Sequence, residues 1–458
     1  MQIIEHFLMA FAGYAWGPWL LILLIGGGFF FLLYSRFLPF RYFGHAVDVI
    51  RGKFDDPNDE GEVTHFQALS SALAGTIGLG NIGGVAIAIQ TGGPGAIFWM
   101  WISAIVGVAT KFFTCGLAIM YRGPDSQGHL QGGPMYMVVH GLGEKWRPLA
   151  NFFCIACMIG SAPVFQVNQL VQILREIALP AEYLAAGDAT VFNFICGLIV
   201  AAIVASVVLG GIQRIAAVAS RIVPFMVALY VAAAGWILLS HWVDIPNYFG
   251  MIISDAFTGR AVAGGAIGLV IVTGIRRAAF SNEAGIGTEA LAHGAAKTNE
   301  PTREGLVAMM GPIVDTLVIC TSTAVIILSA GTWQNNDLNG VTLTAQAFEY
   351  NLPGVGAWLL VLCVLFFSTS TMFSFSYYGT KSLGFLIGAE YQYLYNYLYV
   401  FSIIAGAMAS IDSVVNLIDG MFALMAIPTM VSSLWLAPRL MPVVREYFRE
   451  HKLRNASA

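Results

Sequence analysis

The segment from Gly75 to Gly84 holds five glycines in ten residues and lies inside an apolar run, 66–89. Glycine loses more backbone entropy on ordering than any other residue, so a straight helix is not expected here. An unwound backbone exposes amide groups that can hold a carboxylate at a helix start. It also exposes carbonyl oxygens that can ligate sodium, and Asn81 could add its side-chain oxygen. The segment therefore predicts a site for a small zwitterion and a cation.

The alternative interpretation of these glycines is a close-packing face between helices. Such a face needs small residues at every fourth position, whereas these five glycines point all round a helix. Unwound backbone at membrane depth is tolerated only where protein buries it or where it lines a wet cavity. We therefore favour a broken helix whose interruption binds ligands.

A second interruption, Phe280–Thr288, lies at the centre of the apolar run 262–296. Ser281 and Asn282 offer neutral hydrogen-bond donors and acceptors there, and Glu283 offers a charge. An ionisable group inside a membrane span is a functional candidate by default. The second break is therefore expected to supply the other half of the site.

Two residues of this break have two interpretations each. Glu283 could serve a ligand, or it could form an ion pair with Arg276 or Arg277, which are close in sequence. Phe280 could wall a pocket or simply pack. The sequence leaves both questions open.

Two further polar sets lie in apolar runs. Ser368–Thr371 places four hydroxyl groups in the run 354–379, more than back-bonding to the preceding turn requires. One face of them could complete an oxygen cage around a cation. Gln166 follows the expected kink at Gly160 and Pro163 and could face the same pocket.

The composition restricts the chain to one class of protein. It is 57% hydrophobic and only 10% charged, where a soluble protein would carry about 25% charge. About 20 apolar residues cross the hydrocarbon core of a bilayer. We predict an all-α polytopic membrane protein with eleven spans, near 17–38, 66–90, 95–121, 148–174, 190–210, 214–240, 262–296, 303–330, 354–379, 393–411 and 413–438.

The Lys and Arg residues are distributed unevenly between the loops. With the N-terminus outside, the cytoplasmic loops and tail hold 17 of the 22 basic residues, and the outer loops hold only Arg175 and Arg260. Cytoplasmic loops of membrane proteins carry an excess of Lys and Arg. We therefore predict an outside N-terminus and a cytoplasmic C-terminus.

The two breaks then lie in the second and seventh spans, which run in opposite directions. Corresponding helices of opposite direction are what an inverted five-plus-five repeat requires. We predict an extra N-terminal helix and cytoplasmic loop at 1–65, a first five-helix repeat at 66–240, a second, inverted repeat at 241–438 and a basic tail at 439–458.

At these residues the chain resembles the alanine/glycine:cation (sodium:alanine) symporter family. The resemblance covers nearly the whole chain and is most specific in the stretches Ala68–Ala86, Gly92–Trp101, Gly132–Tyr136 and Phe280–Gly287. It implies the LeuT-type inverted-repeat fold with one additional helix and two broken helices. It also implies import of alanine or glycine with sodium, and in some members with protons.

The shorter stretch Gly78–Asn81 resembles the first broken helix of the neurotransmitter:sodium symporters. This likeness implies that the amides of Leu79 and Gly80 hold the substrate carboxylate. It implies that the carbonyls of Ala74 and Ile77 bind sodium with hydroxyls of the run 354–379. The predicted substrate site is Thr76, Gly78, Leu79, Gly80, Asn81, Gln166, Phe280, Ser281 and Asn282, and the predicted sodium site is Ala74, Ile77, Thr369 and Ser370.

Three features qualify these assignments. Thr76 and Asn81 match positions that line the substrate or a second sodium, but Gly75 stands where those transporters often have a polar residue. Gln166 matches a glutamine in the fourth span of the family, although the three residues after it depart from the commoner pattern. The choice of Thr369 and Ser370 among the four hydroxyls is our own.

The predicted function is secondary active import of a small neutral amino acid, alanine or glycine, coupled to sodium by alternating access. The alternatives are a proton-coupled symporter and a channel, although a channel would need a continuous polar path. No HExxH, GxSxG or histidine cluster suggests an enzyme. The expected partners are the amino acid, sodium and the lipid of a bacterial inner membrane, with no nucleic acid. The oligomeric state stays open, a monomer included.

Overall fold

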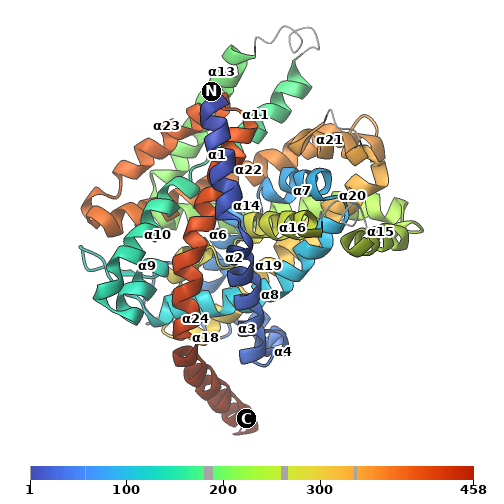
Figure 1. Cartoon of the computed structure of the whole chain (residues 1–458). Helices are drawn as coiled ribbons and strands as arrows, with labels where there is room; N and C mark the ends of the chain where they lie inside the picture. The colour runs from blue at the N-terminus through green and yellow to red at the C-terminus, as the bar shows by residue number, and fades with distance from the viewer. Residues whose placement is uncertain (1, 57, 180–188, 259–266, 335–337, 458) are drawn as a thin grey trace.

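The computed structural model describes residues 2–56, 58–179, 189–258, 267–334 and 338–457. Helices make up nearly all of its regular structure (Figure 1). The two ends of the chain lie at opposite ends of the molecule, with α24 running towards the C-terminal end (Figure 1).

The first half of the chain forms helices joined by one short hairpin, in which β1 pairs antiparallel with β2. In chain order the elements are α1 (Gln2–Ala15), α2 (Pro18–Leu21), η1 (Ile22–Gly26), α3 (Gly27–Tyr34), α4 (Leu38–Arg41), α5 (Phe43–Ile50), α6 (His65–Thr76), η2 (Gly80–Gly84), α7 (Val85–Gly92), α8 (Gly95–Met120), β1 (Gly123–Pro124), β2 (Leu130–Gln131), α9 (Pro134–Tyr136), η3 (Met137–Leu142), η4 (Glu144–Trp146), α10 (Arg147–Gly160), α11 (Val164–Ala178), α13 (Thr190–Val208) and α14 (Gly211–Ser240).

The second half is entirely helical in the part that the structure describes. Its elements are α15 (Ile245–Thr258), α16 (Ile267–Asn282), α17 (Thr288–Gly294), α18 (Pro301–Ala308), α19 (Met310–Pro312), η5 (Ile313–Cys320), α20 (Thr321–Ala330), η6 (Thr332–Gln334), α21 (Gly340–Asn351), α22 (Gly356–Ile387), η7 (Ala389–Tyr391), α23 (Leu394–Met408) and α24 (Ile411–Ser457).

Seven helices of the described residues are long and apolar enough to cross a membrane, and two bent helix pairs raise the number to nine. Two other expected spans did not meet this standard. α23 has 15 residues, fewer than the about 20 needed to cross the hydrocarbon core. The expected span 262–296 begins in 259–266, outside the described residues, and is interrupted after Asn282. The total of eleven spans stays a prediction.

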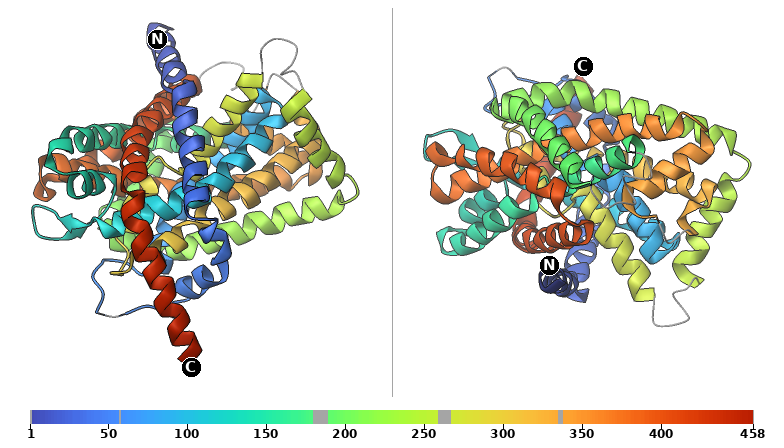
Figure 2. Two further views of the ribbon diagram at one scale, coloured as in Figure 1. Left: turned by 60° about the horizontal axis from the view of Figure 1, so that its bottom comes forward. Right: turned by 90° about the horizontal axis from the view of Figure 1, so that it is seen from above.

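The N-terminal region differs from the expected single span at 17–38. α1 precedes this span and meets α2, η1 and α3 at a bend of 45°. Pro18 occupies the start of α2, and proline has no amide hydrogen to continue the helical ladder from α1. α1 packs along α24 (Figure 2). Just after α1, the Trp16 indole donates to the Asp419 carbonyl oxygen at 2.8 Å.

The outward faces of the peripheral helices are apolar. α13 exposes Phe194, Leu198 and Ile199, and α23 exposes Leu398 and Phe401. Isolated large apolar side chains are common on soluble proteins, but whole apolar helix faces are suited to lipid. The described surface therefore fits a multi-pass membrane protein.

Two interrupted helices lie at the centre of the fold. α6 starts with a capping box between Thr64 and Gln67 and is followed by η2 and α7 at a bend of 51°. Between α16 and α17, three residues adopt positive φ: Glu283 (56°), Gly285 (84°) and Gly287 (105°). This conformation is incompatible with a right-handed helix, so the chain is unwound there.

The half-helices of one break pack against those of the other. η2 and α7 lie against α16, and α6 lies against α17. α8 supports α16, α17 and α18 from one side, and α22 packs against α6, α10 and α14 (Figure 1). These contacts bring both breaks next to η5 and α22.

Candidate functional site

The backbone amides of the first break donate to side chains instead of to the helix. The α6 ladder ends with the Ile77 amide on the Leu73 carbonyl (2.7 Å). The Gly78 amide donates to Asn81 Oδ1 (2.9 Å), and the Leu79 amide donates to Gln166 Oε1 (3.2 Å). The carbonyls of Ala74 and Gly75, four residues back, therefore lack the amides that a continuous helix would provide.

Asp315 of η5 connects the two breaks. Its Oδ1 accepts a hydrogen bond from Asn81 Nδ2 (2.6 Å), and its Oδ2 accepts from Ser281 Oγ (2.8 Å) and Thr316 Oγ1 (2.7 Å). All four side chains are fully buried. Hydrogen bonds to an ionised group are about twice as strong as neutral ones, so this cluster holds the breaks at a defined separation.

Asn282 directs its amide into the protein. Its Nδ2 donates to Thr316 Oγ1 (3.0 Å), and its Oδ1 accepts from the Ala284 amide (3.0 Å). Both ends of the side chain thus stabilise the unwound segment. In this structure Asn282 organises the second break.

Phe280 lies between the two breaks and a wall of aromatic side chains. Its ring packs edge-on against Phe165 (4.9 Å between centroids) and near Phe422 (5.7 Å). A Cβ added to Gly80 would lie 3.2 Å from this ring. Phe280 therefore packs and also limits the space beside the first break.

The remaining predicted substrate residues lie at or near the first break. A Cβ on Gly78 would come within 3.4 Å of Gln166 Oε1 and 2.4 Å of Thr371 Oγ1, so α6, α11 and α22 converge there. The Thr76 hydroxyl donates to the Ala72 carbonyl of its own helix (3.2 Å). The structure brings together Gly78, Leu79, Gly80, Asn81, Gln166, Phe280 and Ser281.

The hydroxyl groups of α22 point in different directions. Thr369 donates to the Leu365 carbonyl (2.6 Å), and Ser370 lies near Met226 Sδ of α14 (3.4 Å). Thr371 instead lies against Gly78, and Ser374 donates to the Ser71 carbonyl (2.9 Å). The helix thus turns Thr371 and Ser374 towards the first break.

Thr371 and Ser374 were not selected from the sequence. Their spacing of three residues places them on one helix face, which is the signal that could have found them. The sequence could not say which face of α22 meets α6. The proposed sodium ligands Thr369 and Ser370 stay a prediction.

The arginines before the second break pair with α24. Arg276 Nη2 lies 2.5 Å from Asp419 Oδ2, and Arg277 donates to the same oxygen. The alternative in which Glu283 pairs with Arg276 or Arg277 is therefore wrong. Asp419 neutralises part of their charge and leaves Glu283 without either partner.

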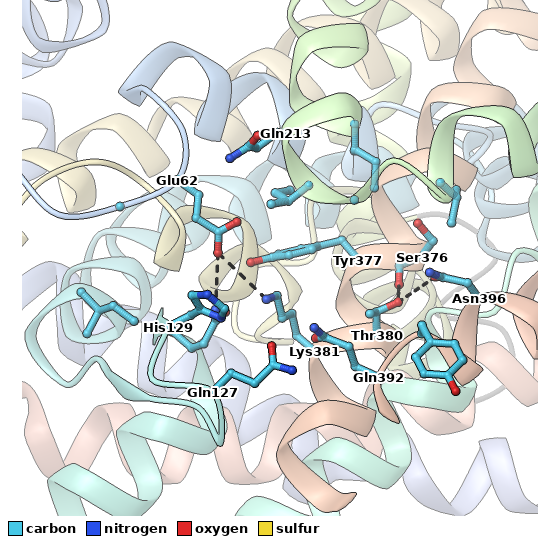
Figure 3. Close-up of a pocket in the computed structure, with 18 of the residues that line it drawn as sticks. Glu62, Gln127, His129, Gln213, Ser376, Tyr377, Thr380, Lys381, Gln392 and Asn396 are labelled. Atoms are coloured by element: carbon cyan, nitrogen blue, oxygen red, sulfur yellow. Dashed lines mark hydrogen bonds and ion pairs between the residues drawn. The ribbon is translucent and has the colours of Figure 1, made fainter. Parts of the chain in front are cut away.

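A polar cavity of about 880 Å³ opens beside the second half of α22 (Figure 3). Ser376, Tyr377 and Lys381 line it from α22, and Glu62 faces Lys381 at 4.0 Å (Figure 3). We call this cavity the vestibule. No sequence signal indicated it, since loops, the β hairpin and helices far apart in the chain build it.

One solved structure establishes the fold by comparison. MhsT in complex with L-phenylalanine matches with a TM-score of 0.54 over 84% of this chain and 98% of that chain, at 12% sequence identity. MhsT has the LeuT-type fold of membrane transporters. Together with two interrupted central helices and several helices able to cross a membrane, this defines a multi-pass membrane protein with that fold.

The chain belongs to the sodium:alanine symporter family, whose model matches residues 1–458. The sodium/alanine symporter AgcS of Methanococcus maripaludis is 38% identical over 97% of each chain. An uncharacterized transporter of Haemophilus influenzae is 36% identical over 99% of this chain and 98% of that protein. The probable sodium/glutamine symporter GlnT of Bacillus subtilis is 32% identical over 98% of this chain and 92% of its own length. The predicted family is confirmed, and these relatives support amino-acid transport.

Proposed function

We propose that this protein imports a small neutral amino acid, alanine or glycine, together with sodium by alternating access. The observation that carries this proposal is the linkage of both breaks through Asn81, Asp315 and Ser281. A ligand bound at one break changes the hydrogen bonds that position the other. The printed name of AgcS, a sodium/alanine symporter, supports the choice of substrate and ion.

The amino-acid carboxylate binds the amides of Leu79 and Gly80. Gln166 Oε1 accepts from the Leu79 amide at 3.2 Å, so a carboxylate at this place displaces the glutamine oxygen. The freed Gln166 amide then offers its N–H groups to the substrate. Phe280 beside Gly80 leaves room only for a small side chain.

Sodium binds the carbonyls of Ala74 and Ile77 with hydroxyls of α22. The Gly78 and Asn81 amides, which a helix would direct to these carbonyls, donate elsewhere. Thr369 and Ser370 are the predicted hydroxyl ligands, and Thr371 joins them because it touches the break at Gly78. Each charge moved inwards gains about 2.3 kcal/mol per 100 mV of membrane potential.

The N-terminus is proposed to lie outside and the vestibule on the cytoplasmic side. Basic residues support this orientation, because Lys297 and Lys381 line the vestibule and cytoplasmic loops carry an excess of Lys and Arg. The contacts of α6 with α17 and of α7 with α16, which pair the halves of one broken helix with those of the other, support the inverted repeats 66–240 and 241–438. The vestibule is then the route by which the substrate leaves.

Uptake of labelled alanine into proteoliposomes tests this function. We expect accumulation above equilibrium only when sodium is higher outside, with competition by glycine. Glutamine is the informative third substrate, since GlnT is named as a probable sodium/glutamine symporter. Alanine flux that never exceeds equilibrium, or that ignores sodium, would contradict the proposal.

A further inference from the structure

Three carboxylates surround the second break, and all are buried: Glu283, Glu289 and Asp315. Asp315 accepts three side-chain hydrogen bonds, as described above. Glu289 accepts from the Thr114 hydroxyl (2.9 Å) and from the amides of Gly285 (3.4 Å) and Gly287 (3.1 Å). Donors of this kind stabilise the ionised form of a carboxylate.

Glu283 differs from the other two carboxylates. Its Oε2 accepts from the Thr288 hydroxyl, whereas its Oε1 has no hydrogen-bond partner although it is fully buried. Among the described residues it forms no ion pair, because Arg276 and Arg277 bind Asp419. A buried carboxylate with an unpartnered oxygen is unfavourable when it is ionised.

The backbone also singles out Glu283. Its φ of 56° makes it the only buried residue other than glycine with positive φ in the described part of the chain. Positive φ strains the backbone of any residue other than glycine. The packing around the second break therefore holds the carboxyl group where a glycine would fit more easily.

Two further unpartnered hydroxyls lie at the neighbouring helices. Tyr378 Oη of α22 and Ser71 Oγ of α6 are buried without hydrogen-bond partners. Tyr378 Oη lies 2.9 Å from the position of a Cβ on Gly75, so it reaches the first broken helix. Tyr378 lies within electrostatic reach of Glu283. The next residue, Tyr377, lines the vestibule.

Charge balance around the break argues that one carboxyl group holds a proton. The titratable groups that face Glu283 are Lys111 of α8, Glu289 of α17, Asp315 of η5, Cys157 of α10 and Tyr378 of α22. Lys111 is the one cation of this group, facing three acids. Because Glu289 and Asp315 have donors on both oxygens, Glu283 is the acid that takes the proton.

We propose that Glu283 is a proton-binding site through which this transporter carries a proton inwards together with the amino acid, an inference that rests on the proposed symport. The proton forms an O–H bond at Oε1 while the site is open to the outside. The same proton returns to water when the vestibule side opens past Tyr378. Nothing is oxidised or reduced, and the site is distinct from the sodium ligands of the first break.

Proteoliposomes loaded with a pH-sensitive dye test this proposal, with the membrane potential clamped by potassium and valinomycin. Alanine added with sodium should acidify the lumen of wild-type vesicles. Glu283→Gln should retain sodium-dependent alanine exchange but lose the acidification. Glu144→Gln, which removes an exposed carboxylate on the surface, is the matched control and should acidify as the wild type does.

Glu283→Asp keeps a carboxyl group at this position, so it tests the proposal even if Glu283→Gln fails to fold. It should acidify the lumen with a shifted pH dependence. Sodium-driven alanine uptake without acidification in the wild type, or undiminished acidification with Glu283→Gln, overturns the proton site while leaving the proposed symport intact. A wild type that acidifies with alanine but ignores sodium overturns sodium coupling and supports Glu283.

Discussion

Asn81 is the residue on which both breaks depend. It accepts from the Gly78 amide, and it donates to Asp315 at 2.6 Å in a fully buried place. A side chain with both a donor and an acceptor is required for these two contacts. The same asparagine that stops the helix thus connects it to η5.

Asn81→Ala should weaken alanine uptake without unfolding the protein. The change removes a hydrogen bond to a charged group, worth about 1.5–3 kcal/mol, or roughly a 10- to 100-fold rise in KM for alanine. Transport kinetics in proteoliposomes measure it, with Asn58→Ala on the surface as control. An unchanged KM for alanine and sodium would remove Asn81 from the site.

Gly78 is a second residue whose replacement gives a defined outcome. A Cβ there would lie 2.4 Å from Thr371 Oγ1, and overpacking of this kind costs about 1–3 kcal/mol. Gly78→Ala should therefore lose most uptake and lower the Tm in detergent, and Thr371→Ala added to it should restore part of the Tm. Gly235→Ala, in open space on α14, should transport normally. Failure of the double variant to recover would show that the clash is elsewhere.

At the scale of the elements, α16 is held to α24 by charge. Arg276 and Arg277 share Asp419, which is 1% exposed. Both guanidinium groups of α16 therefore contact one carboxylate of α24. The first half of the second broken helix is therefore anchored to the C-terminal helix rather than to its own second half.

Asp419→Ala should be strongly destabilising. Removing one partner of a buried ion pair costs about 3–5 kcal/mol because it leaves charges uncompensated. Thermal unfolding in detergent should show a large fall in Tm. Asp412→Ala, an exposed position on the same helix, should leave Tm nearly unchanged, and equal effects of both variants would disprove the anchoring role.

The short helix α5 docks on α24 outside the membrane-spanning segments, and His45 lies between them. The His45 ring bonds the Tyr447 hydroxyl (2.7 Å). Burial, with the nearby His451, lowers the pKa of His45 to about 4. The unfolded chain binds its proton near pH 6.5, so this contact is fully stable above that pH and weakens as pH falls towards 4.

His45→Gln should flatten this part of the pH dependence of stability. The wild type should lose Tm relative to the variant as the pH is lowered from about 6.5 to about 4, since only the wild type must protonate a buried ring. Melting curves of both proteins in detergent across this range give the difference. A difference that is constant with pH would exclude His45 as the cause.

At the scale of the whole molecule, the vestibule lies on one side of the fold, beside the second half of α22. It is lined by α22 and by the β hairpin, one side of the fold only. Alternating access requires that this opening exchange with one on the other side. The exposure of residues that line the vestibule is therefore expected to change as the transporter passes through its cycle.

Gln127, which lines the vestibule and is exposed, should report this opening. In a background with Cys196→Ser, Gln127→Cys should react with a membrane-impermeant maleimide in inside-out vesicles and be protected in right-side-out vesicles. Sodium with alanine should change the rate of labelling. Labelling from the outside only would reverse the proposed orientation.

Much of this protein could be predicted from its sequence because the signals are local. Glycine content and apolar length act on the backbone of the residues that carry them, so the breaks at Gly75–Gly84 and Phe280–Thr288 were visible without a structure. The family followed from motifs in the same stretches, whereas the eleven spans and the orientation stay predictions. The N-terminal bend at Pro18 was missed, although it is local, because the chain is mostly apolar on both sides of it.

Only the tertiary structure decided which residues meet. The link from Asn81 to Asp315, the pairing of Arg276 and Arg277 with Asp419, and the face of α22 that presents Thr371 each depend on how helices are rotated about their axes. Helix rotation is set by the packing of the whole bundle, which no single segment encodes. The sequence by itself determined that two helices must break, and the fold determined which side chains surround the breaks.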